Sequence, residues 1–157
     1  MAGLTAFVKE SNKIEGILRE PTKAEVEAHQ TILRMSSGIL DMKALQDFVA
    51  VIAPGKFLRD KRGMDVRVGS HIAPRGGPEI GDALCEILTS ACEGGDPYEV
   101  HHRYETLHPF MDGNGRSGRV LWLWMMQTYG SFDAITLGFL HNWYYQSLSH
   151  SQFRSER

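Results

Sequence analysis

Hydrophobic residues recur at intervals of three and four along most of this chain, which is the spacing of amphipathic helices. Capping residues mark where several of these helices begin. Thr22 starts a capping-box pattern with Glu25, and Asp41 and Asp96 stand directly before two later apolar runs. Glycine and proline mark where the helices end. The pattern predicts helices over residues 4–18, 22–36, 41–52, 79–93, 97–107, 115–129 and, in the tail, 133–148.

Residues 55–78 break this spacing, because apolar residues there mix with glycine, arginine, aspartate and proline. Within them, Asp65 to Val68 alternate between polar and apolar, as a short strand does. We therefore expect a loop that carries a small hairpin. The fold class that follows is mainly α, a helical bundle with one small β-hairpin. A length of 157 residues suits a single domain over residues 1–157.

Composition and charge limit the classes of protein to which this chain can belong. Lys and Arg number 17 and Asp and Glu number 19, so the net charge is −2. No bulk positive charge exists to hold nucleic acid or an anionic membrane, and any anion site must be built locally. Cys85 and Cys92 are too few for a disulfide scaffold and are expected to be buried free thiols. The longest apolar run, Val120–Met126, is far too short to span a membrane. These features predict a cytoplasmic protein with neither nucleic acid nor membrane as a partner.

The segment His108–Arg119 lies between two predicted helices and concentrates anion-binding residue types. Its sequence is His-Pro-Phe-Met-Asp-Gly-Asn-Gly-Arg-Ser-Gly-Arg. The Gly-Asn-Gly of residues 113–115 accepts the backbone angles of a turn whose amides point inward. This turn leads into a helix N-terminus, which favours negative charge. Arg116 and Arg119 are three residues apart and share one helix face, so two guanidinium groups beside a ring of amides suit a polyphosphate.

Asp112 and His108 flank this turn. A lone carboxylate beside phosphates would repel them unless a cation intervenes, and Mg²⁺ binds one or two carboxylates together with phosphate oxygens. The imidazole of His108 can take a proton near neutral pH, which suits deprotonation of an attacking hydroxyl. Phe110 is expected to anchor the loop in the core. The set indicates phosphoryl or nucleotidyl transfer. The alternative is a glycine-rich turn with a capping aspartate and solvated arginines.

This segment resembles the signature of the Fic family, His-x-Phe-x-(Asp/Glu)-Gly-Asn-Gly-Arg-x-x-Arg, at every fixed position. The family is mainly α-helical, and most characterised members transfer AMP from ATP to a Ser, Thr or Tyr hydroxyl of a target protein. The resemblance therefore implies a protein adenylyltransferase that uses ATP and Mg²⁺. The kinase-like Doc branch departs from the Gly-Asn-Gly-Arg pattern, which this chain keeps. By matching positions, the resemblance implies a general base at His108, a Mg²⁺ ligand at Asp112, a phosphate cradle at Gly113, Asn114 and Gly115, support of the phosphates by Arg116 and a γ-phosphate site at Arg119.

Residues 11–16, Ser-Asn-Lys-Ile-Glu-Gly, are similar to the family's autoinhibitory pattern, (Ser/Thr)-x-x-x-Glu-(Gly/Asn). Their place before the core implies the self-inhibited class with an N-terminal inhibitory helix, in which Ser11 and Glu15 carry the inhibition. We expect Glu15 to pair with Arg119 and to occupy the place that a γ-phosphate needs. The alternative is a solvated glutamate at a helix end, followed by an ordinary glycine cap.

Two further predictions depend on position within the family. The hairpin corresponds to the family's flap, which aligns a target segment by strand addition; an ordinary surface hairpin is the alternative. Tyr144 and Tyr145 fall where relatives carry tyrosines near the adenine, although core packing of these rings is equally expected. Which nucleobase the site prefers stays open. The predicted flap residues are Val66, Arg67, Val68, Gly69, Ser70, His71 and Ile72.

The sequence leaves a second class of function open, a nucleotide-binding regulatory domain with little catalytic activity. The intact His108 favours an enzyme, because a binding module needs the anion site but not the base. Among enzymes, removal of AMP from modified proteins is a further alternative, in which Glu15 positions a water molecule. The sequence identifies no target, so the expected partner is a protein substrate of unknown identity. Self-modification and a homo-oligomer are open alternatives.

Overall fold

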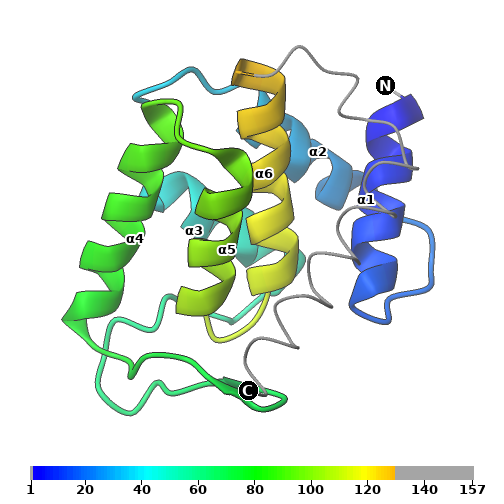
Figure 1. The fold of residues 1–157 in the computed structure, drawn as a ribbon. Helices are drawn as coiled ribbons and strands as arrows, with labels where there is room; N and C mark the ends of the chain where they lie inside the picture. Colours follow the sequence, from blue (N-terminus) through cyan, green and yellow to red (C-terminus); the bar gives the residue numbers. More distant parts are fainter. Residues whose placement is uncertain (1, 130–157) are drawn as a thin grey trace.

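The structure is a computed structural model that describes residues 2–129, and these form a bundle of helices with one small hairpin (Figure 1). The mainly α fold class is therefore confirmed. The predicted tail helix near 133–148 lies outside the described residues. The elements are α1 (Ala2–Ile14), α2 (Lys23–Leu33), α3 (Met42–Ile52), β1 (Arg67–Val68), β2 (His71–Ile72), α4 (Pro78–Cys92), α5 (Pro97–Leu107) and α6 (Asn114–Tyr129).

Side-chain caps begin three helices at the positions that the sequence predicts. The Thr22 hydroxyl accepts a hydrogen bond from the Glu25 amide at 3.1 Å, and the Glu25 carboxylate accepts one from the Thr22 amide at 2.9 Å. Asp41 caps α3 and Asp96 caps α5 in the same way, each through a side-chain oxygen. These oxygens satisfy amides that have no acceptor within the helix. The end of α2 was predicted less well, since this helix stops at Leu33 and not near residue 36.

The predicted first helix, over residues 4–18, was wrong at its C-terminal end. α1 stops at Ile14, and Glu15 lies in the turn that follows. Gly16 ends the helix with a φ of +78°, a left-handed conformation that favours glycine. Leu18, which the helical spacing placed on the apolar face, is 76% exposed. Glu15 therefore stands on a fixed turn beyond the helix.

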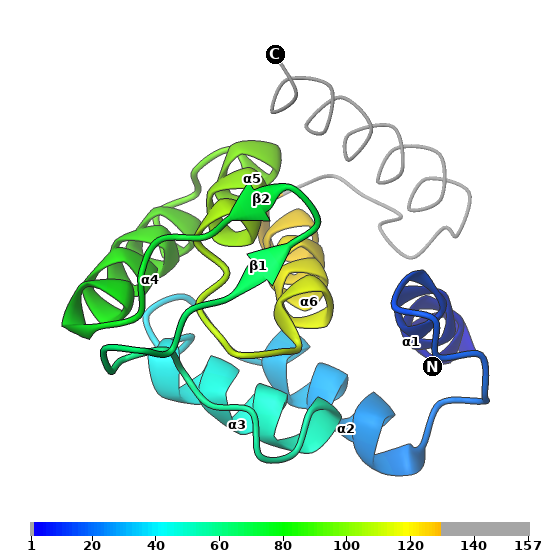
Figure 2. The same ribbon diagram turned by 90° about the horizontal axis from the view of Figure 1, so that it is seen from below.

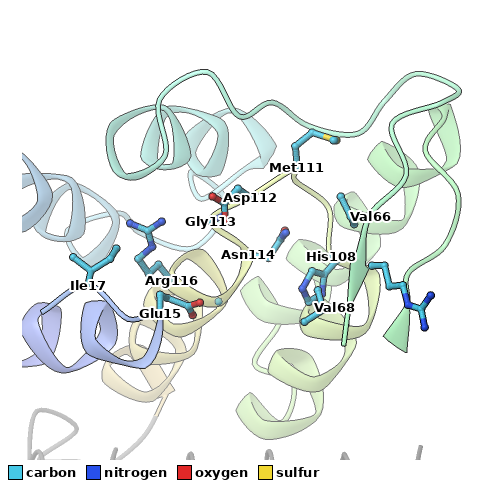
Figure 3. A pocket seen from close by; sticks show the side chains of 12 residues that line it. Glu15, Ile17, Val66, Val68, His108, Met111, Asp112, Gly113, Asn114 and Arg116 are labelled. Carbon is cyan, nitrogen blue, oxygen red and sulfur yellow. The ribbon is translucent and has the colours of Figure 1, made fainter. Parts of the chain in front are cut away.

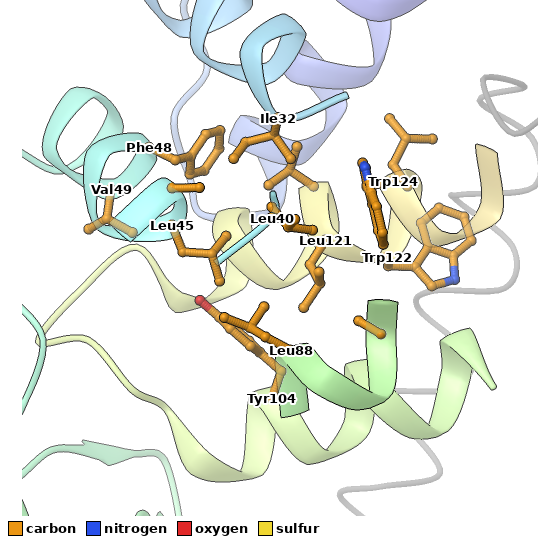
Figure 4. Packing of buried hydrophobic residues seen from close by; sticks show 14 of the residues in the cluster. Ile32, Leu40, Leu45, Phe48, Val49, Leu88, Tyr104, Leu121, Trp122 and Trp124 are labelled. Carbon is orange, nitrogen blue, oxygen red and sulfur yellow. The ribbon is translucent and has the colours of Figure 1, made fainter. Parts of the chain in front are cut away.

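α6 is the central helix of the bundle and contacts α1, α2, α3 and α5. Trp122 and Trp124 are both buried among aliphatic side chains from the surrounding helices (Figure 4). The Trp124 indole N–H donates a hydrogen bond to the Met35 carbonyl at 2.8 Å. A helix that is enclosed on all sides is fixed by its packing. The N-terminal turn of α6, which carries the candidate segment, is fixed with it.

The hairpin lies at the end of the bundle where α5 ends and α6 begins (Figure 2). Its strands are antiparallel, with Arg67 opposite Ile72 and Val68 opposite His71. Gly69 takes a φ of +58° in the turn between them. The hairpin is shorter than the alternation from Asp65 onward predicts, but it stands where the sequence places it.

Two further expectations concern the cysteines and membranes. Cys85 is exposed and Cys92 is partly exposed, and both are free thiols. The expectation of burial was wrong for Cys85, because α4 buries Leu84 and Ile87 on a face that Cys85 does not share, whereas Cys92 is partly buried against the core. Among the helices of residues 2–129, none has both the length and the hydrophobicity that crossing a bilayer requires.

Candidate active site

A cavity of about 570 Å³ lies beside the start of α6 (Figure 3). Three separate parts of the chain line it: the turn after α1, the hairpin strand β1 with the residue before it, and the segment from His108 to Arg116. The structure thus brings together the predicted catalytic loop, the predicted inhibitory glutamate and part of the predicted flap. The lining residues are Glu15, Ile17, Val66, Arg67, Val68, His108, Met111, Asp112, Gly113, Asn114, Gly115 and Arg116.

The loop between α5 and α6 is held by Phe110 and Asn114. The Phe110 side chain is 1% exposed, which confirms it as the apolar anchor. The Asn114 amide group makes two hydrogen bonds to the backbone of Phe110, one to its N–H and one to its carbonyl, each 2.8 Å long. The Asn114 side chain is therefore used to shape the loop, and its backbone amide is the part that an anion can reach.

The first turn of α6 presents amides toward the cavity. In the part of the chain that the structure describes, the amide N–H groups of Asn114, Gly115 and Arg116 donate to no acceptor, as is usual at a helix N-terminus. The amide of Gly113, in contrast, donates to the Asp112 carboxylate at 2.7 Å. A side chain at Gly115 would collide with the Glu15 carboxylate, so glycine there permits a close approach. Of the residues predicted as a cradle, Asn114 and Gly115 thus have unoccupied amides together with Arg116, whereas the amide of Gly113 is occupied.

Arg116 and Arg119 have different partners. The Arg116 guanidinium donates to the Ile52 carbonyl at 2.9 Å, and burial lowers its pKa. Arg119 is 1% exposed and does not line the cavity. Its guanidinium donates to the Ser11 hydroxyl at 2.7 Å, to the Ser11 carbonyl at 3.0 Å and to the Glu15 carboxylate at 2.6 Å. Glu15 therefore contacts the arginine that the sequence predicts as its partner, and Ser11 contacts the same arginine.

His108 caps the C-terminus of α5 and faces the cavity. Its ring nitrogen Nδ1 is hydrogen-bonded to the Glu105 carbonyl. Because a carbonyl only accepts, Nδ1 carries the proton, and Nε2 of the neutral ring keeps a free lone pair. Burial lowers the pKa of His108, the Glu105 carbonyl raises it, and the nearby His71 and Arg59 lower it further. The lowered pKa keeps the ring neutral near pH 7 and able to accept a proton.

Asp112 is the carboxylate in this cavity that fits a magnesium ion. It is exposed, and one of its oxygens accepts from the Gly113 amide. Within residues 2–129, no group of three His, Cys, Asp or Glu side chains could hold a metal alone. A single carboxylate is enough for Mg²⁺ when phosphate oxygens complete the coordination. Asp112 therefore fits Mg²⁺ that arrives with a nucleotide.

The comparison with family models matches residues 22–126 to the Fic/DOC family. The chain belongs to the Fic/DOC family. The match includes the signature from His108 to Arg119 and begins after α1, so Ser11 and Glu15 precede the matched residues. No curated protein and no solved structure matches the chain significantly. Members of the family generally transfer nucleotide-derived groups to proteins.

The remaining predicted residues of this Fic domain lie as follows. Val66, Arg67 and Val68 line the cavity, whereas the rest of the predicted flap, residues 69–72, does not. His71 instead makes a hydrogen bond through Nε2 to the Thr106 carbonyl at 3.0 Å. Tyr144 and Tyr145 lie outside the described residues.

Sequence reasoning missed two side chains of this Fic domain. Arg59 is fully buried and donates to the His108 carbonyl at 2.6 Å. Glu105, which is largely buried between α5 and α6, has a pKa that burial raises to about 8, while the nearby Arg119 opposes the shift. The apolar Leu58, which is buried beside Arg59, was the one local sign that this part of the loop enters the core. Neither Arg59 nor Glu105 belongs to a recognisable motif.

Proposed function

We propose that this Fic domain is a protein adenylyltransferase that transfers AMP from ATP to a Ser, Thr or Tyr hydroxyl of a target protein. One observation carries the proposal: the proton-accepting nitrogen of His108 and the free amides of residues 114–116 belong to the same cavity. A proton acceptor beside an anion site is what nucleotidyl transfer to a hydroxyl requires.

In this mechanism, Nε2 of His108 takes the proton of the target hydroxyl while its oxygen attacks the α-phosphorus of ATP. The bond between the α-phosphorus and the oxygen that bridges to the β-phosphate breaks, and pyrophosphate leaves. The amides of residues 114–116 and the charge of Arg116 hold the phosphates in place. Asp112 would hold Mg²⁺, which offsets the negative charge of the phosphates when bound.

We further propose that Glu15 inhibits this transfer. Arg119 is the residue that would receive the γ-phosphate, and the Glu15 carboxylate pairs with it at 2.6 Å. Glu15 also lines the cavity while Arg119 does not, so its negative charge lies between the cavity and the arginine. A γ-phosphate displaced from Arg119 misaligns the α-phosphate, and a displacement of about 1 Å can cost roughly a hundredfold in rate.

Removal of AMP from a modified protein is the second candidate function. The observation that favours it is that Glu15 and His108 line the same cavity, so that the carboxylate can position a water molecule instead of only blocking ATP. A domain that only binds nucleotides is disfavoured, because such a domain has no need for a histidine whose Nδ1 is fixed and whose Nε2 is free.

Intact mass spectrometry of the Glu15→Gly variant, after incubation with ATP and Mg²⁺, tests the proposal. We expect a gain of one AMP group on the protein itself or on a protein of an added lysate. Glu20→Gly is the matched control, because Glu20 is an exposed glutamate on the linker after α1 and pairs with Lys9 of that helix. A folded Glu15→Gly variant that gains no AMP and modifies no protein would overturn the proposed transfer. If the wild-type protein instead removes AMP from a modified protein and Glu15→Gly does not, the second candidate replaces the first.

A further inference from the structure

Arg59 is a charged side chain enclosed by backbone carbonyls next to the proposed base. It is 0% exposed. Its Nε donates to the His108 carbonyl at 2.6 Å and its Nη2 to the Leu107 carbonyl at 2.8 Å. Its Nη1 donates to the carbonyls of Met64 and Pro74 at 3.0 and 2.8 Å. Among the described residues, no carboxylate forms an ion pair with it. The charge of the nearby Asp65 acts on Arg59 without pairing with it, and burying a charge that is not ion-paired is costly, so the carbonyl contacts must compensate.

Two of these contacts act on an unusual backbone conformation. His108 has φ +47° and ψ +65°, and within residues 2–129 it is the one residue other than glycine with a positive φ. Such a conformation persists only where the surroundings enforce it. The carbonyls of Leu107 and His108 belong to the end of α5, where carbonyls have no partner within the helix and the helix dipole favours a cation. Arg59 satisfies both carbonyls and thereby fixes the peptide groups on either side of the His108 α-carbon.

The direction of the imidazole depends on this backbone. Nδ1 of His108 reaches the Glu105 carbonyl one turn back along α5, and this bond leaves Nε2 for the cavity. If the His108 backbone relaxed to a right-handed or extended conformation, the side chain would leave this carbonyl. Arg59 does not line the cavity itself, so any effect it has on a proton transfer acts through His108.

The other two contacts act on the hairpin. Met64 precedes β1 and Pro74 follows β2, so one nitrogen of Arg59 joins both legs of the hairpin loop. The backbone of Arg59 is also joined to the loop that follows His108, because the Arg59 amide donates to the Pro109 carbonyl at 2.9 Å. From these contacts we infer that Arg59 is a positioning residue, which holds His108 in its left-handed conformation and fixes the hairpin at a set distance from it. The inference builds on the proposed role of His108 as the base.

NMR spectroscopy tests this inference without requiring activity. In the wild-type protein we expect a scalar coupling across the hydrogen bond from Arg59 Nε–H to the His108 carbonyl carbon. We also expect imidazole ¹⁵N shifts that place the neutral His108 proton on Nδ1, with the His108 signals assigned by their loss in His108→Asn. In Arg59→Met the proton should move toward Nε2. Arg62→Met is the matched control and should leave the tautomer unchanged, because Arg62 is exposed on the same loop and pairs with Glu79.

Arg59→Lys keeps the charge but cannot reach all four carbonyls, so it should restore part of the Nδ1–H population. If Arg59→Met does not fold, Arg59→Lys takes its place, and the wild-type coupling is measurable in either case. In the Glu15→Gly background, the Arg59 variant should lose about a hundredfold in kcat with the KM for ATP unchanged. An unaltered His108 tautomer in the folded Arg59 variant, or an absent coupling in the wild type, overturns the inference. Absence of AMP transfer from every variant would instead overturn the proposed function, while the tautomer still decides the role of Arg59.

Discussion

The Glu15 carboxylate lies 2.6 Å from the Arg119 guanidinium, although the two residues are 104 positions apart in the sequence. The same guanidinium binds the hydroxyl and the carbonyl of Ser11, so one buried arginine of α6 holds the end of α1 through three hydrogen bonds. A movement of α1 away from α6 would leave a buried charge without these partners, which is unfavourable. The contact thus connects the position of α1 to the state of the candidate site.

The Ser11→Ala substitution should weaken this contact. It removes the hydroxyl that accepts from Arg119 Nε at 2.7 Å and leaves a buried donor unsatisfied. We expect the free energy of unfolding to fall by about 1–3 kcal/mol. We also expect AMP transfer to rise above the wild-type level but to stay below that of Glu15→Gly. Denaturant unfolding and labelled-ATP incorporation measure the two effects. An activity equal to that of the wild type would exclude a role for Ser11 in the inhibition.

The Glu25 carboxylate connects the end of α1, the linker that follows it and the start of α2 through hydrogen bonds. Its carboxylate accepts from the Asn12 side chain at 2.8 Å, from Arg19 at 2.6 Å and from the Thr22 amide at 2.9 Å. Burial raises the pKa of Glu25, but these hydrogen bonds outweigh it and lower the pKa from 4.5 to about 2. Since the pKa is lower in the folded state, the stabilisation is complete above about pH 4.5 and is lost as the pH falls toward 2. Glu25→Gln should lower the unfolding free energy at neutral pH by about 1–3 kcal/mol.

Urea unfolding between about pH 7 and about pH 3 checks the Glu25 prediction. The wild type should lose stability below pH 4.5 more steeply than Glu25→Gln does. Glu27→Gln is the control, because Glu27 is an exposed glutamate on the same helix with only a 3.7 Å pair to Lys23. Parallel curves for the wild type and Glu25→Gln would show that the carboxylate contributes nothing.

The pH dependence of AMP transfer should report the lowered pKa of His108. Burial is the main cause of this shift, and the rate should rise with pH as the imidazole loses its proton. In the Glu15→Gly variant, the rising limb should therefore have its midpoint below 6.5, the ordinary value for histidine. His71→Asn removes a neighbour whose electrostatic effect lowers the pKa of His108, so it should move the midpoint upward. A midpoint at or above 6.5 in the variant that keeps His71 would contradict the environment described for His108.

Glu105→Gln should make the protein more stable at alkaline pH. Burial raises the pKa of Glu105 from 4.5 to about 8. Because the pKa is higher in the folded state, the stability is present below pH 4.5 and is lost as the pH rises toward 8. A neutral glutamine avoids this loss, so Glu105→Gln should exceed the wild type by at least about 1 kcal/mol near pH 8. Thermal unfolding at several pH values measures the difference, and Glu99→Gln, an exposed change on α5, should show none.

Local chemistry made much of the fold predictable. Thr22, Asp41 and Asp96 begin helices because their side chains satisfy amides of the same turn, and such contacts depend only on neighbouring residues. The segment from His108 to Arg119 was also predictable as a unit, because its glycines, arginines and histidine lie within 12 consecutive residues. The apolar spacing of residues 115–129 likewise predicts α6 closely.

Features that depend on distant segments were not predictable. The apolar spacing of α1 continues through Ile17, so only the left-handed Gly16 reveals that the helix has ended. The burial of Arg59 depends on carbonyls from three separate parts of the chain. Asn114 belongs to a phosphate-binding pattern, yet its side chain is used within the loop. None of these relationships leaves a periodic trace in the sequence.

The most direct test of the proposed reaction is to determine which phosphate of ATP becomes attached to protein. Glu15→Gly is incubated with Mg²⁺ and with ATP labelled either at the α-phosphate or at the γ-phosphate, and His108→Ala in the same background is the control. We expect the α-phosphate label on protein, no γ-phosphate label, and loss of the signal in the His108 variant. Incorporation of the γ-phosphate label, or transfer that continues without His108, would contradict AMP transfer by this base.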